Sequence, residues 1–242
     1  MNIIVPMAGL GERIAKGGYT VPKPLVKVQN KIIVEWAIKS LKLDANFIFC
    51  CKQIHIDKYK IDKILKNIIP DCIIVPINYH TEGTVQTILE AKKYIDNDEE
   101  LIISDSDHYI IWDKLKFQNK IRNKLSDACV FIFPTKQNSK YFSYVKTNKE
   151  GYVLESAEKE KISNIAACGI HYYKKGSDFV KYASNMIQKN IRFNNEFYVT
   201  PVYNEFISAG KKITTFKIIK KWALGDPDEI KEFLKNHSKN TE

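Results

Sequence analysis

The first half of the chain alternates between short apolar runs and segments whose apolar residues recur every three or four positions. Runs rich in β-branched residues predict buried strands, and the periodic segments predict amphipathic helices. The predicted strands span 2–6, 46–51, 72–77, 100–104 and 128–134, and the predicted helices span 31–42, 56–68, 83–95 and 113–124. This alternation predicts an α/β fold of Rossmann-like type, with a mixed, mainly parallel sheet flanked by helices on both faces.

The second half of the chain is less regular. The predicted strands span 143–148, 151–154, 168–173 and 213–219, and the predicted helices span 176–189, 198–209 and 227–236. The last helix opens from Gly225-Asp226-Pro227, a favoured start because aspartate caps a helix and proline fits its first position. No linker rich in proline, glycine or serine interrupts the chain. We therefore expect a single domain over 1–242, in which 136–242 forms a lid over the half at 1–135.

Composition narrows the classes of function. The formal net charge is +10, but the lysines are scattered and form no arm or stripe. This pattern argues against a nucleic-acid partner and favours small anionic substrates. There is no apolar run of about 18 residues, so we expect no membrane insertion. Five cysteines without Cys-x-x-Cys spacing predict buried, free thiols and a cytoplasmic protein.

A glycine-rich turn, Met7-Ala8-Gly9-Leu10-Gly11, follows the first predicted strand. Gly9 and Gly11 allow a sharp turn and a close approach to a ligand, and successive N–H groups in such a turn bind anions. Arg13 adds a fork of donors that fits phosphate oxygens, and Lys23 adds a point charge. The segment therefore predicts a triphosphate site.

The order Ala8-Gly9-Leu10-Gly11-Glu12-Arg13, followed by Pro22-Lys23-Pro24, resembles the N-terminal signature of the nucleotidyltransferases that make nucleotide-activated sugars. Two other glycine motifs do not fit, because Ile14 replaces the third glycine of a dinucleotide fingerprint and no Gly-Lys-Ser/Thr is present. The resemblance implies the nucleotide-diphospho-sugar transferase fold. It also implies nucleotide binding by residues 7–11 and catalytic roles for Arg13 and Lys23.

The same resemblance implies the reaction. A nucleotidyl group would pass from a nucleoside triphosphate to a phosphorylated metabolite, with release of pyrophosphate. The acceptor would be a sugar 1-phosphate or a small phosphate ester, as in the synthesis of surface polysaccharide precursors.

Two aspartates, Asp105 and Asp107, follow the fourth predicted strand. The carboxyl ends of parallel strands share one edge of a sheet, so these side chains should lie near the glycine turn. In nucleotide sites Mg²⁺ is held by one or two carboxylates together with phosphate oxygens. The family resembled keeps a metal-binding aspartate here, a role that we assign to Asp107, with Asp105 as the second candidate. His108 is expected to be a polar loop residue.

The segment Thr81-Glu-Gly-Thr-Val-Gln-Thr87 follows the third strand and opens a helix. In similar proteins a Gly-Thr at this point lies against the base and ribose, which implies nucleotide binding by Glu82, Gly83 and Thr84. The residues alone also fit an ordinary helix cap and first turn.

A Glu-Lys pair, Glu158 and Lys159, precedes the predicted strand that contains Gly169 and Ile170. In the family resembled, the lysine holds the phosphate of the second substrate and the glutamate faces its hydroxyls. This implies acceptor binding by Glu158, Lys159 and Gly169, and a catalytic role for Lys159.

One region departs from the family pattern. Better-known members carry a second metal-binding aspartate where this chain has Pro201. Glu196 or Asp226 could supply the missing carboxylate, and we take Glu196 as the candidate metal ligand.

Two other functions stay open: a glycosyltransferase of related fold, with Asp105-Ser106-Asp107 as its Asp-x-Asp motif, and a non-catalytic nucleotide-binding subunit. The base, the acceptor and the formation of a homo-oligomer also stay open.

Overall fold

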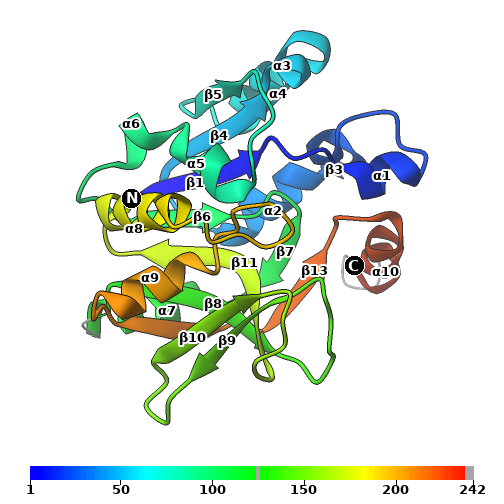
Figure 1. The fold of residues 1–242 in the computed structure, drawn as a ribbon. Coiled ribbons are helices and arrows are strands. Elements are labelled where there is room, and N and C mark those ends of the chain that lie inside the picture. Colours follow the sequence, from blue (N-terminus) through cyan, green and yellow to red (C-terminus); the bar gives the residue numbers. More distant parts are fainter. Residues whose placement is uncertain (124–125, 238–242) are drawn as a thin grey trace.

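The computed structural model describes residues 1–123 and 126–237 (Figure 1). It confirms the five strands predicted in the first half, which are β1 (Asn2–Met7), β4 (Asn46–Lys52), β5 (Ile73–Ile77), β6 (Leu101–Ser104) and β8 (Ala128–Pro134). Helices α2 (Ile33–Leu41) and α7 (Lys114–Asn123) also match, although the predicted end of α7 at 124 lies outside the described residues.

Two predicted helices are each divided into a pair. The segment 56–68 forms α3 (Gln53–Tyr59) and α4 (Ile61–Ile68), because Lys60 adopts a left-handed conformation with φ 52°. The segment 83–95 forms α5 (Thr84–Leu89) and α6 (Lys92–Ile95). The apolar periodicity continues across both breaks, which is why it does not reveal them.

The central sheet has the strand order β5-β4-β1-β6-β11-β8-β12 (Figure 1). β1 pairs in parallel with β4 and β6, and β4 pairs in parallel with β5. β11 (Ile165–Tyr173) lies between β6 and β8 and runs antiparallel to both. β12 (Ile213–Lys217) is parallel to β8. All first-half strands of this sheet therefore point the same way, and the fold is the expected mixed, mostly parallel sheet.

Residues 136–237 add a hairpin and three larger helices. The hairpin is β9 (Ser143–Thr147) and β10 (Val153–Glu158), and the helices are α8 (Gly176–Gln188), α9 (Val202–Ser208) and α10 (Pro227–His237). The predicted helix at 198–209 begins only at Val202, since Pro201 occupies its N-cap position.

Several short elements were not predicted. They are α1 (Glu12–Lys16), the 3₁₀ turn η1 (Lys23–Leu25), β2 (Lys27–Val28), β3 (Lys31–Ile32), β7 (His108–Ile111) and β13 (Lys220–Ala223). β7 pairs antiparallel with β13 in a separate small sheet, and this pairing joins the segment after β6 to the segment before α10.

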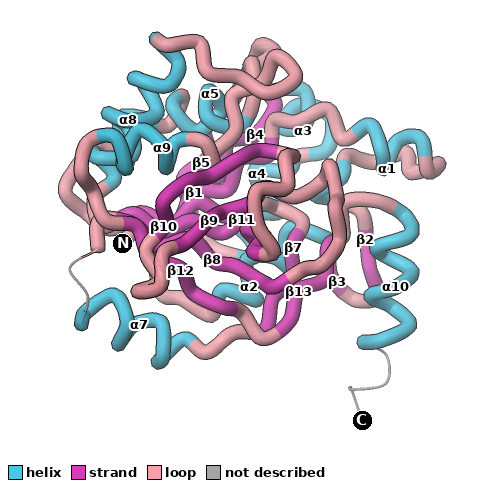
Figure 2. The backbone as a smooth tube through the Cα atoms, turned by 60° about the horizontal axis from the view of Figure 1, so that its bottom comes forward, coloured by secondary structure: helices cyan, strands magenta, loops and turns pink. Residues whose placement is uncertain are grey.

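Alternate residues of β1 point to opposite faces of the sheet. Ile3 and Val5 pack on the face covered by α2, α4 and α7, whereas Ile4 packs on the face covered by α5, α8 and α9. Figure 2 shows the strands running through the centre with helices on either side. Because helices cover both faces of the sheet, a ligand can bind only beyond the carboxyl ends of the strands. Among the described residues, none of the helices is long and apolar enough to cross a membrane.

Candidate active site

The glycine turn lies open at the carboxyl end of β1. Gly9 and Leu10 are exposed, whereas Met7 and Ala8 are buried. Apart from Gly9 and its two chain neighbours, none of the described residues has an atom within 4 Å of the position that a Cβ on Gly9 would occupy. Gly11 has φ +67°, a conformation that favours glycine, and it is the N-cap residue of α1. The exposed backbone of this turn is therefore free to approach a ligand.

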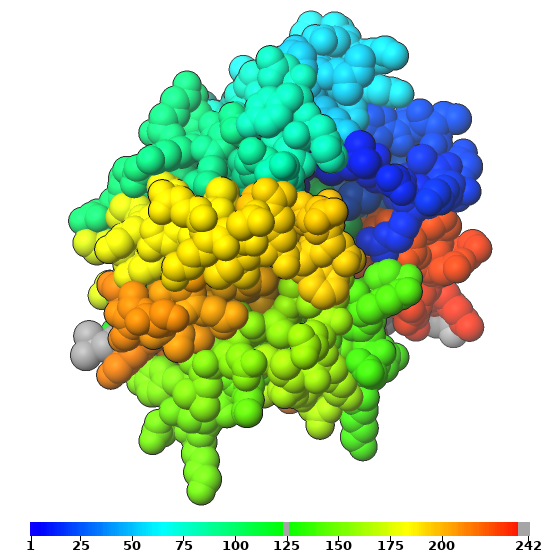
Figure 3. All heavy atoms as spheres, in the orientation of Figure 1, coloured from blue at the N-terminus to red at the C-terminus, as the bar shows by residue number. Residues whose placement is uncertain are grey.

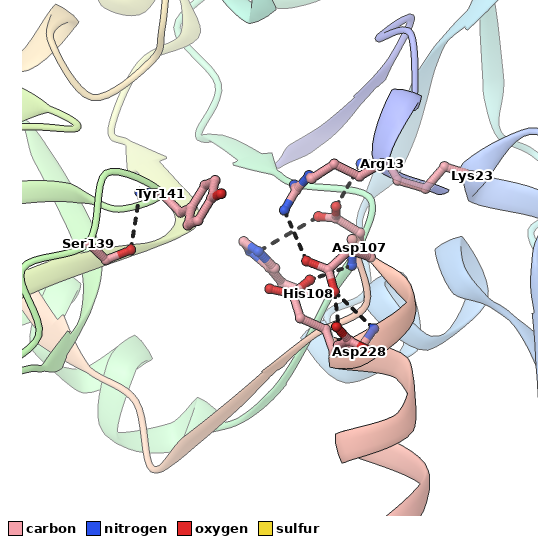
Figure 4. A network of polar contacts seen from close by, with 10 residues as sticks. Arg13, Lys23, Asp107, His108, Ser139, Tyr141 and Asp228 are labelled. Carbon is pink, nitrogen blue, oxygen red and sulfur yellow. Dashed lines mark hydrogen bonds and ion pairs between the residues drawn. The ribbon is translucent and has the colours of Figure 1, made fainter. Parts of the chain in front are cut away.

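Arg13, one residue into α1, is half-exposed beside the turn. Its Nη1 lies 3.3 Å from Oδ2 of Asp226, which is 213 residues away in the chain. The other oxygen of Asp226 accepts the N–H groups of Asp228 and Glu229, so this carboxylate also caps α10. The Arg13 guanidinium carbon lies 5.8 Å from the centre of the Tyr141 ring. Figure 4 shows Tyr141 facing Arg13 across the site.

Lys23 and Asp107 form the closest ion pair of the site. Lys23 Nζ lies 2.6 Å from Asp107 Oδ2, and the Asp107 side chain is only 10% exposed. Lys23 is held by η1, in which Pro24 is buried, and it packs against Gly11. Burial by itself opposes ionisation of Asp107, but the surrounding positive charges, Lys23 foremost and Lys221 with it, together keep the pKa of Asp107 below its usual range.

Asp105, Asp107 and His108 form a cluster of three groups able to hold a metal ion. One ligand atom from each lies within 4.8 Å of the others. Burial and the negative charge of Asp107 raise the pKa of Asp105. Burial lowers the pKa of His108 to about 3, so its imidazole is neutral at physiological pH. The donor set of two carboxylates and a neutral imidazole fits a divalent cation.

Gly169 on β11 packs closely against this cluster. It has φ +80°, and a Cβ built there would stand 1.9 Å from Asp105 Oδ2 and 2.7 Å from His108 Nδ1. The Asp105 N–H donates to the Gly169 carbonyl oxygen at 2.9 Å. Gly169 was predicted to contact the acceptor, and the structure places it against the carboxylate cluster.

Glu158 and Lys159 lie at the end of β10. Glu158 is buried and accepts a hydrogen bond from Ser143, and burial raises its pKa. Lys159 has φ 57°, an unusual conformation for a lysine, and its Nζ donates to the Tyr198 hydroxyl at 2.5 Å. The Tyr198 hydroxyl donates in turn to Glu196. Glu196 therefore belongs to the Lys159 network and lies outside the metal-binding cluster of the described residues.

The loop at Glu82 and Gly83 is joined to the segment 192–198. The Phe197 N–H donates to the Glu82 carbonyl oxygen at 2.8 Å, and a Cβ on Gly83 would stand 2.5 Å from the Phe197 nitrogen. Arg192 pairs with the Glu82 carboxylate at 2.9 Å. Thr84 begins α5 directly after this contact. Figure 3 shows the gold segment around 190–200 bordering the blue N-terminal segment.

The structure brings the predicted catalytic, metal-binding and acceptor-binding residues into two groups. Asp105 and Asp107 belong to the carboxylate cluster, and Arg13, Lys23 and Gly169 lie around it. Lys159 and Glu196 are linked through the Tyr198 hydroxyl in a second polar network, and buried Glu158, bonded to Ser143, precedes Lys159 in the chain. Neither His108 nor Tyr141 was predicted from the sequence to be a site residue. The only signal for His108 was its position directly after Asp107, whereas Tyr141 lies in a loop that carries no motif.

Solved structures with the same fold have low sequence identity to this chain. A nucleoside-diphosphate-sugar pyrophosphorylase from Vibrio cholerae RC9 has a TM-score of 0.83 at 21% identity, covering 97% of this chain and 100% of that one. A UDP-glucose pyrophosphorylase complexed with UDP-glucose has a TM-score of 0.76 at 18% identity, covering 98% of both chains. The inositol-1-phosphate CTP transferase from T. maritima has a TM-score of 0.75 at 13% identity, covering 97% and 96%.

A comparison with curated proteins finds no match. The model of the nucleotidyl transferase family matches residues 3–238, which is nearly the whole chain. The chain therefore belongs to the nucleotidyl transferase family and is a nucleotidyltransferase.

Proposed function

We propose that this nucleotidyltransferase uses a nucleoside triphosphate as donor and a phosphorylated small molecule as acceptor, and that it releases pyrophosphate with the help of Mg²⁺. The observation that carries the proposal is the contact of Lys23 with Asp107 beside the open glycine turn. It places a lysine and a buried carboxylate at the edge of the sheet where the exposed residues Gly9 and Leu10 lie. A triphosphate site uses cationic side chains and backbone N–H groups for the phosphate oxygens and a carboxylate for the accompanying cation.

In the proposed reaction an oxygen of the acceptor phosphate attacks the α-phosphorus of the triphosphate. The bond between that phosphorus and the oxygen leading to the β-phosphate breaks, and pyrophosphate leaves. Such chemistry depends on positioning and charge stabilisation, so no covalent enzyme intermediate is required. Arg13 and the amides of Gly9 to Gly11 bind the leaving pyrophosphate, and Lys23 stabilises the charge at the reacting phosphate.

The residues present fit a divalent cation. Asp107 Oδ2 is paired with Lys23, whereas no hydrogen bond among the described residues reaches Asp107 Oδ1. Asp107 and Asp105 would hold the ion. Such an ion supplies charge neutralisation on the triphosphate oxygens.

The second polar network supports an acceptor site. Lys159 offers a charge for the acceptor phosphate, and buried Glu158 offers an acceptor for substrate hydroxyls. We propose a sugar 1-phosphate or a small phosphate ester as acceptor, in the supply of surface polysaccharide precursors. The free, buried thiols of all five cysteines support a cytoplasmic location.

Pyrophosphate release tests the proposal. CTP, UTP, GTP, dTTP and ATP are each combined with glucose 1-phosphate, inositol 1-phosphate and phosphocholine in the presence of Mg²⁺. We expect release to require one triphosphate and one acceptor. Transfer from a finished nucleotide sugar would instead support a glycosyltransferase, and triphosphate binding without turnover would support a non-catalytic subunit.

Two variants test the site itself. Removing one preorganised donor or ligand of this kind costs about a hundred- to a thousandfold in rate, so Arg13→Ala and Asp107→Ala should lose that much activity. Arg122, an exposed arginine on α7, provides the matched control, and Arg122→Ala should retain the wild-type rate. Near-normal turnover in a folded Arg13→Ala or Asp107→Ala protein would reject the role of that residue.

A further inference from the structure

Lys221 is a half-buried lysine on β13 that holds its charge over two aromatic rings. Its Nζ lies 5.0 Å from the centre of the Phe133 ring and 5.6 Å from the centre of the Phe142 ring. In the part of the chain that the structure describes, this Nζ takes part in no hydrogen bond or ion pair. Aromatic faces attract a cation without using its N–H groups, so all three donors of Lys221 stay available to a ligand.

The pairing of β13 with β7 determines the face from which Lys221 extends. Ala223 lies opposite His108 in this antiparallel pair, and residues directly opposite one another share a face. Lys221 is two positions from Ala223, so it lies on that face as well. Tyr109 and Trp222 lie on the other face, where their ring centres are 5.7 Å apart. Lys221 therefore shares its face with His108, a member of the carboxylate cluster.

The positive charge of Lys221 acts on this cluster. Burial and the negative charge of Asp107 raise the pKa of Asp105, and Lys221 opposes them together with Lys23. Burial is the main cause of the low pKa of His108, and Lys221 adds to it. Because the interaction between charges weakens with distance, these effects agree with the position that the strand pairing gives to Lys221.

Phe142 connects Lys221 to the second polar network. Its ring lies below the Lys221 ammonium, and its carbonyl oxygen accepts the Lys159 N–H at 3.0 Å. Ser143, the next residue in the chain, donates a hydrogen bond to buried Glu158. Lys221 is therefore next to both the carboxylate cluster and the residues to which we assign acceptor binding.

We propose that Lys221 is a further substrate-binding residue, whose ammonium binds the phosphate of the acceptor where that phosphate reaches the carboxylate cluster. A phosphate monoester carries up to about two negative charges at neutral pH, and Lys159 supplies only one positive charge. Arg13 and Lys23 each face a carboxylate already, whereas Lys221 can bind an anion without giving up an ion pair. The inference rests on the proposed function for the identity of this anion.

Substitutions of Lys221 test its role in the reaction. Lys221→Met keeps an apolar side chain over the two phenyl rings and removes the charge, so we expect kcat/KM for the acceptor to fall by about a hundredfold. The KM for the triphosphate should change little, and Lys221→Arg should recover part of the loss. Lys220 is exposed on the same strand and provides the control, since Lys220→Met should keep the wild-type values.

Two kinetic results would overturn the proposal. One is a near-normal kcat/KM for the acceptor in folded Lys221→Met protein. The other is an equal loss for the acceptor and the triphosphate, because a lysine that binds the acceptor phosphate should affect the two substrates differently.

A measurement without turnover separates this proposal from the proposed reaction. Reductive methylation with ¹³C-formaldehyde labels the lysines of the full chain and keeps their charge, and the Lys221 signal in the NMR spectrum is identified by its absence in Lys221→Arg. Titration with inorganic phosphate should shift this signal and leave that of Lys220 in place. A Lys221 signal that does not move, or that moves only as much as the Lys220 signal, would reject the anion site. A selective shift in a protein that releases no pyrophosphate would support the anion site and reject the proposed reaction.

Discussion

At the scale of single residues, Gly169 combines a positive φ with close contact to the Asp105 carboxylate, so a side chain there should affect both the backbone and the site. Gly169→Ala places a Cβ at a positive φ and against the Asp105 carboxylate, so Asp105 must move. We expect pyrophosphate release to fall by about a hundredfold, as for the loss of one preorganised group. Gly151 is the matched control, because it has φ +83° with open space around its Cβ position among the described residues.

Gly151→Ala therefore carries the backbone strain without the collision. Urea unfolding should show both variants destabilised by about 1–2 kcal/mol or more, whereas only Gly169→Ala should lose activity. Equal activity in the two variants would mean that Gly169 is needed for the strand and not for the carboxylate cluster.

His171 predicts a pH dependence of stability that is independent of the active site. It is buried on β11 beside the Tyr203 hydroxyl, at 3.0 Å, and burial lowers its pKa to about 3. In the unfolded chain the pKa of histidine is about 6.5. Between these values the unfolded chain binds a proton that the folded chain does not, so stability is lost as the pH falls from 6.5 to 3, by up to about 1.4 kcal/mol per pH unit.

The measurement is urea unfolding of His171→Gln and of the wild type between pH 7 and pH 4.5. The variant should lose less stability than the wild type over this interval, even if it is less stable at pH 7. His80→Gln, at an exposed position, should follow the wild type. Parallel curves for His171→Gln and the wild type would contradict the assignment.

At the scale of elements, buried strands were the most predictable part of the fold. β1, β4 and β6 are covered by helices on both faces, and continuous apolar runs identify such strands. β7 and β13 have only four residues each and form a separate sheet, so they leave almost no pattern. The helix break at Lys60 was also invisible, since lysine carries no signal for a left-handed conformation.

The candidate site also contains residues that the sequence predicts and residues that it does not. The glycine turn, Arg13 and Lys23 lie close together in the sequence, so a local motif identifies them. The contact between Arg13 and Asp226 depends on where α10 packs, which no local pattern records. His108 was not selected because its position beside the two aspartates depends on packing against the Cys168 carbonyl oxygen, 60 residues away in the chain.

At the scale of the whole molecule, the strand order argues that the chain does not fold in two separate halves. The sequence predicts a single domain with parts at 1–135 and 136–242, and β8 of the first part pairs only with β11 and β12 among the described strands. Both of those partners come from the second half. β11 also supplies the second neighbour of β6.

A fragment of residues 1–135 would therefore leave β8 without a partner and β6 with an open edge. It would also expose the apolar face that α8 and α9 cover in the full chain, and buried apolar surface is the main source of folding stability. We expect the fragment to show no cooperative urea transition and no near-ultraviolet circular dichroism, whereas co-expression with 136–242 should restore both. A cooperative transition in 1–135 alone would show that the parallel strands form an independent folding unit, despite the insertion of β11 between β6 and β8.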